Sequence, residues 1–429
     1  MTPTGCFERR RRPDTVVTSA SVLHPAATTV GELDRILRCG EPTLRRNALR
    51  GGDLAVPAAL LGDFDIRAWA RTHCDPQQAA VLRRVAGRAT VPVQTACCVA
   101  IAACTAAKLT PDEARDTAVV IAGNNLALSY QAAASAAGPG AVRAGHLLNC
   151  FDTDALGAVG EVTGCTGEGW PIGGSSAAGT LALMHAARLV AGGIVPRCLV
   201  VAPVNDLSAL EFSAFVKAGA MARLAPGQDA ASACRPFDQT HDGFAAAHVA
   251  AAVLVESAAG ARRRGVEPLG RVLGHAVGTD GRRTTQPDPA GQAGTMRVAI
   301  ADSGLTPSDI DYVNTHGTGA PLGDDCEAAA LAEVFAGTGT PWINSTKALL
   351  GHGLGASGLL EAIATLLQLA GDYCHRHPFA TAPVRPDLRF ADDTAAHTRL
   401  RTAVSNSFAF SGINASLVLG RATTEEDGS

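Results

Sequence analysis

Short apolar runs alternate with Ala-rich segments of helical spacing along most of the chain. The runs at 117–123 (TAVVIAG) and 197–204 (RCLVVAPV) are continuously apolar, which is typical of strands buried on both faces of a parallel sheet. Between them, the segment from Ser176 to Val190 carries apolar residues at helical spacing and predicts a buried helix. The pattern therefore begins as strand, helix, strand.

The same alternation continues toward the C-terminal end. It predicts further strands at 249–256, 272–277, 310–315, 403–408 and 415–419, and further helices at 290–303, 325–335 and 358–369. Strands that alternate with helices favour an α/β fold with mixed sheets covered by helices. The charged segment 258–268 (AAGARRRGVEP) divides the chain, so we expect one half at 1–258, a second at 259–421 and a solvated tail at 422–429.

The composition indicates a compact protein. Of the 429 residues, 47% are hydrophobic and 18% are charged, whereas only 4% are aromatic, so we expect a core of Ala, Val and Leu. Neither a membrane helix nor a signal peptide is suggested by the apolar runs. Because the net charge is −4, we do not expect a nucleic acid as partner, and we interpret Arg9–Arg12 as part of a solvated tail.

The twelve cysteines follow no regular spacing that would indicate a disulfide framework. Several of them, Cys97, Cys98 and Cys104, lie in an apolar segment that we predict to be helical. Buried, reduced thiols are typical of cytoplasmic proteins, so we expect a cytoplasmic location.

The start of the helix predicted at 176–190 is the first candidate for chemistry. Ser176 could cap the helix, satisfying free backbone N–H groups, or it could be a nucleophile that the helix N-terminus favours. The stretch GSSAA also comes close to the GxSxG nucleophile elbow of serine hydrolases, with Ala178 in place of the last glycine. At this point both a cap and a nucleophile remain open.

The glycine-rich stretch GHGLGASG (351–358) matches the GxGxxG pattern of dinucleotide sites. Asp372 lies near the distance at which such sites place an acidic residue. The dinucleotide interpretation, however, leaves Lys347 and His352 without a role, and a single glycine pattern is weak evidence.

Three segments of the C-terminal half carry polar groups at strand ends. They are VNTHGTGAPLGDDCEA (313–328) with His316, INSTKALLGHGLGASGLLEAI (343–363) with Lys347 and His352, and SNSFAFSGINASLVL (405–419). Two loop histidines and a lysine together form a set of proton donors that is typical of an active site.

These segments closely resemble the β-ketoacyl synthases (ketosynthases) of the thiolase fold, whose motifs read HGTxTxLGD, STKxxxGHxxGAxG and NSFGFGGxN. The stretch ACRPFDQTHDGF (233–244) also resembles the SRPFDxxRDGF motif of the family. Aligning GSSAAGTLAL with the family's TACSSGxxAL without a gap places Ser176 at the position of the nucleophilic cysteine. The resemblance implies a duplicated five-layer α-β-α-β-α architecture and a homodimer.

The resemblance also implies roles for individual residues. Ser176 would take an acyl group from an acyl carrier protein, and His316 and His352 would assist decarboxylation of a malonyl extender and stabilise the enolate. Lys347 would support the second histidine. Backbone N–H groups of Ser176 and Phe410, the gating residue, would form the oxyanion hole.

Two expectations concern groups that would arrive from outside. Thr318 would bind the phosphopantetheine arm, which enters on the carrier protein, so we expect no resident cofactor. We expect no metal site either.

Several positions depart from the family pattern. Ala320 replaces a threonine that contacts phosphopantetheine, Ala409 and Ser411 replace glycines beside the gate, and His248 stands where the family has glutamate. A hydroxyl, unlike a thiol, does not ionise at a helix N-terminus, so Ser176 would need His352 or His316 as a general base. These departures together indicate a naturally divergent member.

We therefore predict an acyltransferase that loads Ser176 from an acyl carrier protein and forms a C–C bond by decarboxylative condensation in polyketide or related secondary metabolism. One alternative is non-decarboxylative transfer or cyclisation to an ester, amide or lactone. Two others are a non-catalytic partner that resembles chain-length factors and a serine hydrolase, which would have a single unduplicated sheet.

Overall fold

In the computed structural model, which describes residues 14–48, 55–379 and 381–422, one long sheet runs through the molecule. In sheet order, the N-terminal strands are β5 (Gly169–Ile172), β4 (Thr117–Ala122), β6 (Arg197–Ala202), β8 (Ala250–Ser257) and β1 (Thr15–Leu23). The C-terminal strands follow as β9 (Gly270–Thr279), β13 (Ile413–Gly420), β12 (Thr402–Ala409), β10 (Tyr312–Asn314) and β11 (Trp342–Asn344). A short pairing of β1 with β9, from Thr15 opposite Val272 to Val17 opposite Gly270, joins the two sets.

The two sets of five strands repeat one pattern of order and direction. β4 is parallel to both β5 and β6, and β10 is parallel to both β11 and β12. β8 is antiparallel to β6 and β1, and β13 is antiparallel to β12 and β9. The sheet is therefore mixed in each half, and the fold is duplicated.

The helices repeat in the same way. Those of the N-terminal half are α1 (Val30–Cys39), α2 (Ile66–His73), α3 (Pro76–Ala86), α4 (Val91–Ala106), α5 (Pro111–Arg115), α6 (Leu128–Ala137), α7 (His146–Asn149), α8 (Thr153–Thr163), α9 (Ala178–Ala191) and α10 (Ala209–Lys217). Those that follow are α11 (Ala258–Arg263), α12 (Pro289–Asp302), α13 (Pro321–Val334), α14 (Lys347–Leu350) and α15 (Ser357–Gly371). In chain order α4, α8 and α9 occupy the places that α12, α13 and α15 occupy in the second half.

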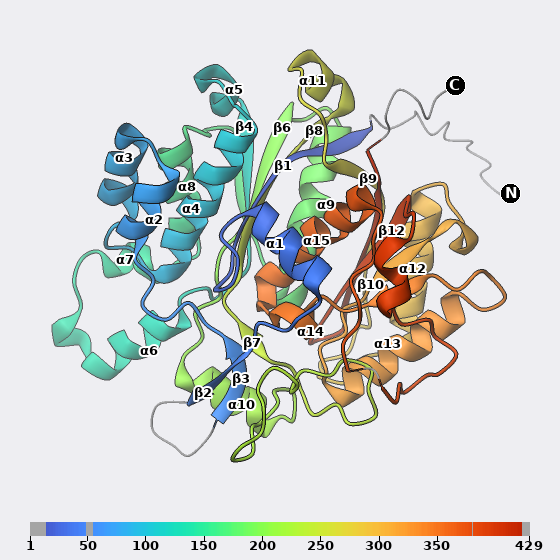
Figure 1. The fold of residues 1–429 in the computed structure, drawn as a ribbon. Coiled ribbons are helices and arrows are strands. Elements are labelled where there is room, and N and C mark those ends of the chain that lie inside the picture. The colour runs from blue at the N-terminus through green and yellow to red at the C-terminus, as the bar shows by residue number, and fades with distance from the viewer. Residues whose placement is uncertain (1–13, 49–54, 380, 423–429) are drawn as a thin grey trace, which may run out of the picture.

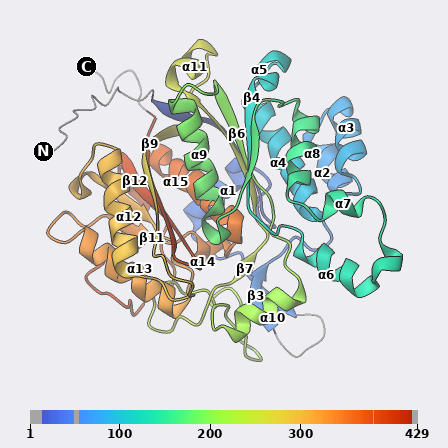
Figure 2. The same cartoon turned by 180° about the vertical axis from the view of Figure 1, so that it is seen from behind.

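This repetition produces five layers. α4 and α8 cover the outer face of the N-terminal strands, and α12 and α13 cover the outer face of the C-terminal strands. α9 and α15 lie between the two sets and contact each other, as both views show (Figures 1 and 2). The predicted thiolase-like, five-layer α/β architecture is confirmed. A small sheet of β2 (Arg45–Ala48), β3 (Ala55–Ala59) and β7 (Ala246–Ala247) lies beside it.

The predicted elements agree with the structure to within about two residues at each end, except for one helix. The helix predicted at 325–335 begins at Pro321, whose fixed backbone angle suits the first turn of a helix. The polar segment 258–268 begins with α11, which Ser257 caps by accepting the N–H of Gly260. We propose that the two halves divide at 258/259, directly after the first residue of α11. The tail from 423 and Arg9–Arg12 lie outside the described residues.

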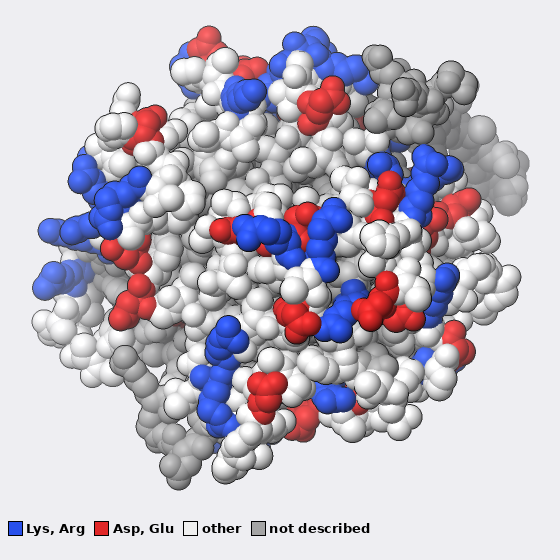
Figure 3. Space-filling view, viewed as in Figure 1, with Lys and Arg blue, Asp and Glu red and all other residues white. Residues whose placement is uncertain are grey.

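The core is built from small aliphatic residues and thiols, as predicted. Cys97 and Cys98 are buried in α4 among Ala and Val, and the eleven cysteines within the described residues are free thiols. One described helix, Leu354–Gly371, is long and apolar enough to cross a membrane, but 78% of it is buried inside the protein, as in a core helix. On the face in Figure 3, basic side chains gather over α2 and α3 and over α11, while acidic and basic side chains are mixed over most of the rest.

Two glycines allow the central helices to approach closely. A Cβ atom on Gly179 of α9 would lie 2.7 Å from the backbone nitrogen of Leu359 in α15. A Cβ atom on Gly358 of α15 would lie 2.9 Å from the backbone nitrogen of Thr180 and 2.8 Å from Ser407 Oγ. Gly358, the last glycine of the GxGxxG match, therefore serves helix packing.

We predict that Gly358→Ala lowers the free energy of unfolding by about 1–3 kcal/mol, because the added methyl group forces α9 and α15 apart. Gly294 in α12 is the control, since a Cβ atom added there would meet nothing within 4 Å and alanine should stabilise the helix by about 0.5–1 kcal/mol. Urea unfolding of both variants measures the difference. Equal stability of the two variants would contradict close packing at Gly358.

Candidate active site

The duplicated helices present their N-terminal turns to each other. The 3₁₀ turn η2 (Ser175–Ala177) precedes α9 and carries Ser176, and the 3₁₀ turn η4 (Leu354–Ala356) precedes α15 and follows His352. Ser175 and Leu354 hold equivalent places and have left-handed backbone angles, with φ of 50° and 52°. Because such angles are costly for residues other than glycine, the surrounding structure must hold both turns. Their sharp bends bring Ser176 and His352 together.

A cavity of about 400 Å³ opens at this point. Its lining includes the predicted residues Ser176, His316, Thr318, His352 and Phe410. Lys347 lies buried behind it, and its ammonium group contacts His316. The structure thus brings together, in one place, the residues that the sequence singled out on three separate segments.

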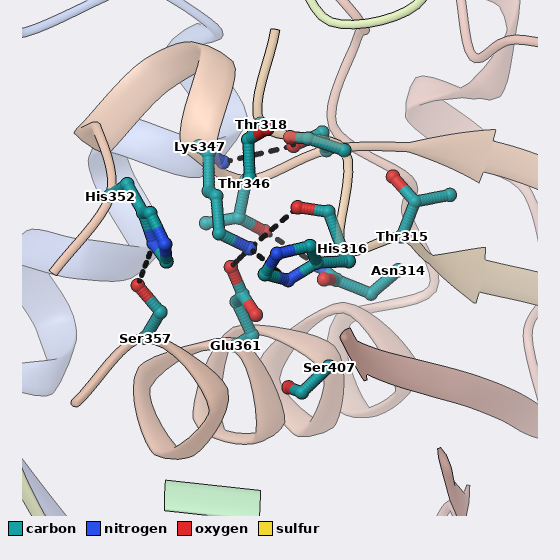
Figure 4. A network of polar contacts seen from close by, with 12 residues as sticks. Asn314, Thr315, His316, Thr318, Thr346, Lys347, His352, Ser357, Glu361 and Ser407 are labelled. Carbon is teal, nitrogen blue, oxygen red and sulfur yellow. Dashed lines mark hydrogen bonds and ion pairs between the residues drawn. The ribbon is translucent and has the colours of Figure 1, made fainter. Parts of the chain in front are cut away.

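His352 stands at the centre of a chain of three polar groups. Its Nε2 lies 3.1 Å from Ser176 Oγ. Its Nδ1 lies 2.9 Å from Ser357 Oγ, a contact drawn in Figure 4. The ring also packs perpendicular to that of Phe244, with centroids 5.2 Å apart. The backbone N–H of His352 donates to Ala245 O at 2.7 Å, which fixes the segment beneath the ring.

Lys347 supports the first histidine, and this corrects the expectation that it supports the second. Its ammonium group donates to the backbone oxygen of His316 at 2.7 Å, lies 3.4 Å from Nδ1 of the same residue and forms an ion pair with buried Glu361 (Figure 4). An ammonium group can only donate, so Nδ1 of His316 is the acceptor. A neutral His316 therefore carries its proton on Nε2.

Both imidazoles are neutral near pH 7. Burial is the main cause that holds the pKa of His316 and of His352 well below the usual value, and the charge of Lys347 acts in the same direction. The two rings lie nearly perpendicular, with centroids 5.5 Å apart. Two neutral imidazoles so close together can act on the same atom of a substrate.

Carboxylates shape the loop that carries His316. Glu327 accepts the backbone N–H groups of His316 at 2.9 Å and Gly317 at 2.8 Å. Asp324 accepts those of Thr318 at 3.0 Å and Gly319. The buried loop backbone is thereby satisfied without using the histidine side chain.

Sequence reasoning missed three side chains that contact the candidate site residues. Glu361 had a detectable signal, since it is the one charged residue in the largely apolar helix predicted at 358–369. Glu327 and Ser357 had none, because a glutamate in a polar helix and a serine among small residues are ordinary.

The gate and the oxyanion hole stay predictions. Phe410 is 41% exposed, lines the cavity and tilts against Phe215, with ring centroids 6.3 Å apart. Ser411, which follows it, has φ of 68°. A serine held in this region supports the expectation of a stiffer gate than glycine would give. Thr318 lines the cavity, and its Oγ accepts the N–H of Ala320 at 3.2 Å.

Other interpretations of the sequence lose support here. A serine hydrolase was expected to have a single unduplicated sheet, whereas this sheet is duplicated. The GHGLGASG stretch connects α14 to α15, not a strand to a helix as a dinucleotide site requires.

Within the described part of the chain, no group of three or more His, Cys, Asp and Glu side chains could hold a metal ion.

The chain matches two models of known families along most of its length. The model of the beta-ketoacyl synthase N-terminal domain matches residues 13–261, and that of the C-terminal domain matches residues 269–378.

Two curated relatives and one solved structure illustrate the similarity. The chain is 34% identical over 272 residues to the polyketide biosynthesis malonyl-ACP decarboxylase PksF of Bacillus subtilis (strain 168), an alignment covering 63% of this chain and 65% of PksF. It is 36% identical over 198 residues to 3-oxoacyl-[acyl-carrier-protein] synthase 2 of Mycobacterium tuberculosis (strain ATCC 25618 / H37Rv), covering 45% and 47%. The chain thus spans less than two thirds of either relative. The ishigamide ketosynthase/chain length factor structure matches with a TM-score of 0.81 and 26% identity, over 96% of this chain and 100% of that one.

Buried histidines predict that acid destabilises the fold. Burial lowers the pKa of seven histidines. It lowers the pKa to about 4 for His24, His248 and His375, and it acts in the same direction on His185, His316, His352 and His377. An unfolded chain binds protons at its histidines near pH 6.5, so their stabilising contribution is complete above that pH and is lost as the pH falls toward the lowered values. Four acids whose pKa is raised by burial have the opposite effect on stability: Asp154, Asp206 with a pKa of about 6, and Glu327 and Glu361 with a pKa of about 7.

We therefore expect the free energy of unfolding to fall between pH 7 and pH 5, by about 2 kcal/mol for each histidine with a pKa near 4, before the opposing acids are counted. Urea unfolding at both pH values measures this. His375→Gln should reduce the pH dependence. A free energy of unfolding that rises toward pH 5 would show that the buried acids dominate.

Proposed function

Because the chain belongs to the beta-ketoacyl synthase family of enzymes, we propose that it decarboxylates a malonyl group carried by an acyl carrier protein, in polyketide biosynthesis. The observation that carries this proposal is a hydroxyl, that of Ser176, beside an intact pair of neutral histidines. The similarity to PksF, whose name gives this activity, supports it.

The half-reaction that needs only the histidines is decarboxylation. The bond between the malonyl Cα and its carboxylate breaks, carbon dioxide leaves, and the electron pair moves onto the thioester oxygen to form an enolate. Hydrogen bonds from Nε2–H of His316 and of His352 would stabilise this oxygen, where charge develops. The enolate carbon then takes a proton from water, which leaves an acetyl group on the carrier protein.

The half-reaction that loses support is loading of an acyl group on residue 176. A thiol at a helix N-terminus can ionise, whereas a serine hydroxyl needs a base to remove its proton. Carbon–carbon bond formation in this family depends on such loading, so replacing thiol by hydroxyl favours decarboxylation alone.

One observation favours the condensation that the sequence predicted. Ser176 Oγ and His352 Nε2 are 3.1 Å apart, which is the distance expected of a nucleophile and its general base. Condensation through an acylated Ser176, and ester, amide or lactone formation through the same intermediate, therefore form the second candidate. A non-catalytic chain-length-factor role is disfavoured, because it does not require two histidines at the cavity with Lys347 behind them.

Decarboxylation can be tested with malonyl carrier protein as the substrate. We expect wild type to release carbon dioxide and form acetyl carrier protein, while His316→Ala loses about 10²–10³-fold in rate because one oxyanion donor is gone. Ser176→Ala should stay within about tenfold of wild type, since the hydroxyl takes no part in bond breaking.

Intact-protein mass spectrometry of the same reactions distinguishes the second candidate. An acyl mass on Ser176, together with loss of turnover in Ser176→Ala, would replace decarboxylation by acyl transfer as the function.

The predicted homodimer has a candidate surface. β5 is an edge strand of the sheet with exposed residues, and α8 packs against it and against α7. Exposed apolar side chains, Val142, Leu147, Leu148 and Phe151, gather around α7. An unpaired strand edge beside exposed apolar residues is typical of a surface that a second copy covers. The cytoplasmic location stays a prediction.

We predict that the chain runs as a dimer in size-exclusion chromatography with light scattering, and that Leu148→Glu converts it to a monomer. Val298 in α12 is a matched control, because it is also an exposed apolar residue but lies on the opposite half. Val298→Glu should leave the dimer intact. A monomeric wild type would overturn the proposed interface.

A further inference from the structure

Ser357 lies at Nδ1 of His352, whereas Ser176 lies at Nε2. The decarboxylation proposed above does not use the hydroxyl of Ser357. Ser357 is the first residue of α15 and is buried, with its hydroxyl turned toward the imidazole (Figure 4). Its Oγ lies 2.9 Å from His352 Nδ1 and accepts the backbone N–H of Gly353 at 2.8 Å. Ser176, His352 and Ser357 therefore form one continuous line of hydrogen bonds.

Counting hydrogens determines the direction of this line. A neutral imidazole has one N–H, and a serine hydroxyl has one proton to donate. If Ser357 donates to Nδ1, its hydroxyl accepts from Gly353, donates to His352 and is fully used. If Nδ1–H donated instead, the hydroxyl would accept two N–H groups, and its own proton would have no acceptor among its partners in the described part of the chain. A buried donor without a partner costs about 1–3 kcal/mol.

We propose that Ser357 is a positioning residue that holds His352 as the tautomer with its proton on Nε2. This inference rests on the proposed decarboxylase function, because it explains how His352 comes to present an N–H group for the malonyl thioester oxygen. The hydrogen bond at one ring nitrogen determines which nitrogen keeps the proton, so a group outside the cavity sets the chemistry inside it.

This tautomer of His352 determines what the hydroxyl of Ser176 can do. With a proton on Nε2, His352 donates to Ser176 Oγ and cannot take the proton of that hydroxyl. The 3.1 Å contact then marks a hydrogen bond to the serine oxygen and not an activated nucleophile. The expectation that His352 serves as the base for Ser176 is replaced.

Lys347 makes the equivalent arrangement at the other histidine. Its ammonium group faces Nδ1 of His316 and leaves the proton on Nε2, as Ser357 does for His352. Two different donors, a buried ammonium and a buried hydroxyl, therefore aim two N–H groups at the same region. A thioester oxygen that becomes an enolate would receive both.

The experiment uses the full chain labelled with ¹⁵N-histidine, and nuclear magnetic resonance reads the protonation of each ring nitrogen of His352. We expect wild type to carry the proton on Nε2. In Ser357→Ala, the Nδ1–H form should appear, the kcat for malonyl carrier protein should fall about 10–100-fold, and KM should change little. The same variant should acquire an acyl mass on Ser176 faster from acetyl carrier protein.

Ser407→Ala is the matched control. Ser407 is equally buried and hydrogen-bonds to Thr180 Oγ at 2.7 Å instead of to a histidine, so its loss removes a buried hydroxyl without changing the tautomer. Ser357→Thr keeps a hydroxyl and should keep the Nε2–H form, which separates the hydrogen bond from mere packing.

Wild type with the proton on Nδ1 would overturn the proposal, as would an unchanged tautomer in Ser357→Ala. Because the wild-type spectrum needs neither a folded variant nor a substrate, this outcome is independent of activity. If wild type shows Nε2–H but releases no carbon dioxide, the decarboxylase function fails while the role of Ser357 stands.

Discussion

The close contact between α9 and α15 is the constraint on which the site depends. Glycines at 179 and 358 remove the side chains that would separate the two helices, so both N-terminal turns reach the same point. Each turn contains a left-handed residue, Ser175 or Leu354, which aims the following segment at the other helix. The 3.1 Å contact between Ser176 and His352 is thus a product of duplication and helix packing.

Burial then determines what the site can do. Taking two imidazoles out of water keeps them neutral, and neutral rings act as donors only at the nitrogen that carries the proton. Lys347 would be costly to bury alone, but Glu361 neutralises it, and the pair lies behind His316. The charged pair of Lys347 and Glu361 lies where it can orient His316. The groups that the two imidazoles present to the cavity are uncharged N–H groups.

Much of this arrangement could be predicted from the sequence, and the limits have physical causes. Strands such as 117–123 are continuously apolar, so their place in a covered sheet follows from pattern alone. Ser176, His316, Lys347 and His352 lie in motifs whose order identifies the family. The partner of Lys347 could not be predicted, because spacing along the chain does not say which of two neighbouring histidines an ammonium group meets. The role of Ser357 depends on the direction in which its hydroxyl proton points, and no sequence pattern indicates that direction.

The most direct test of decarboxylation by two neutral histidines is a single turnover of malonyl carrier protein in deuterium oxide. Mass spectrometry then measures the mass of the carrier protein and of the enzyme. An enolate that takes its proton from solvent predicts acetyl carrier protein with one deuterium and an unmodified enzyme chain. The same reaction with His316→Ala gives the background exchange. Acetyl carrier protein without the added deuterium, or an acyl group bound to Ser176, would contradict decarboxylation by two neutral histidines.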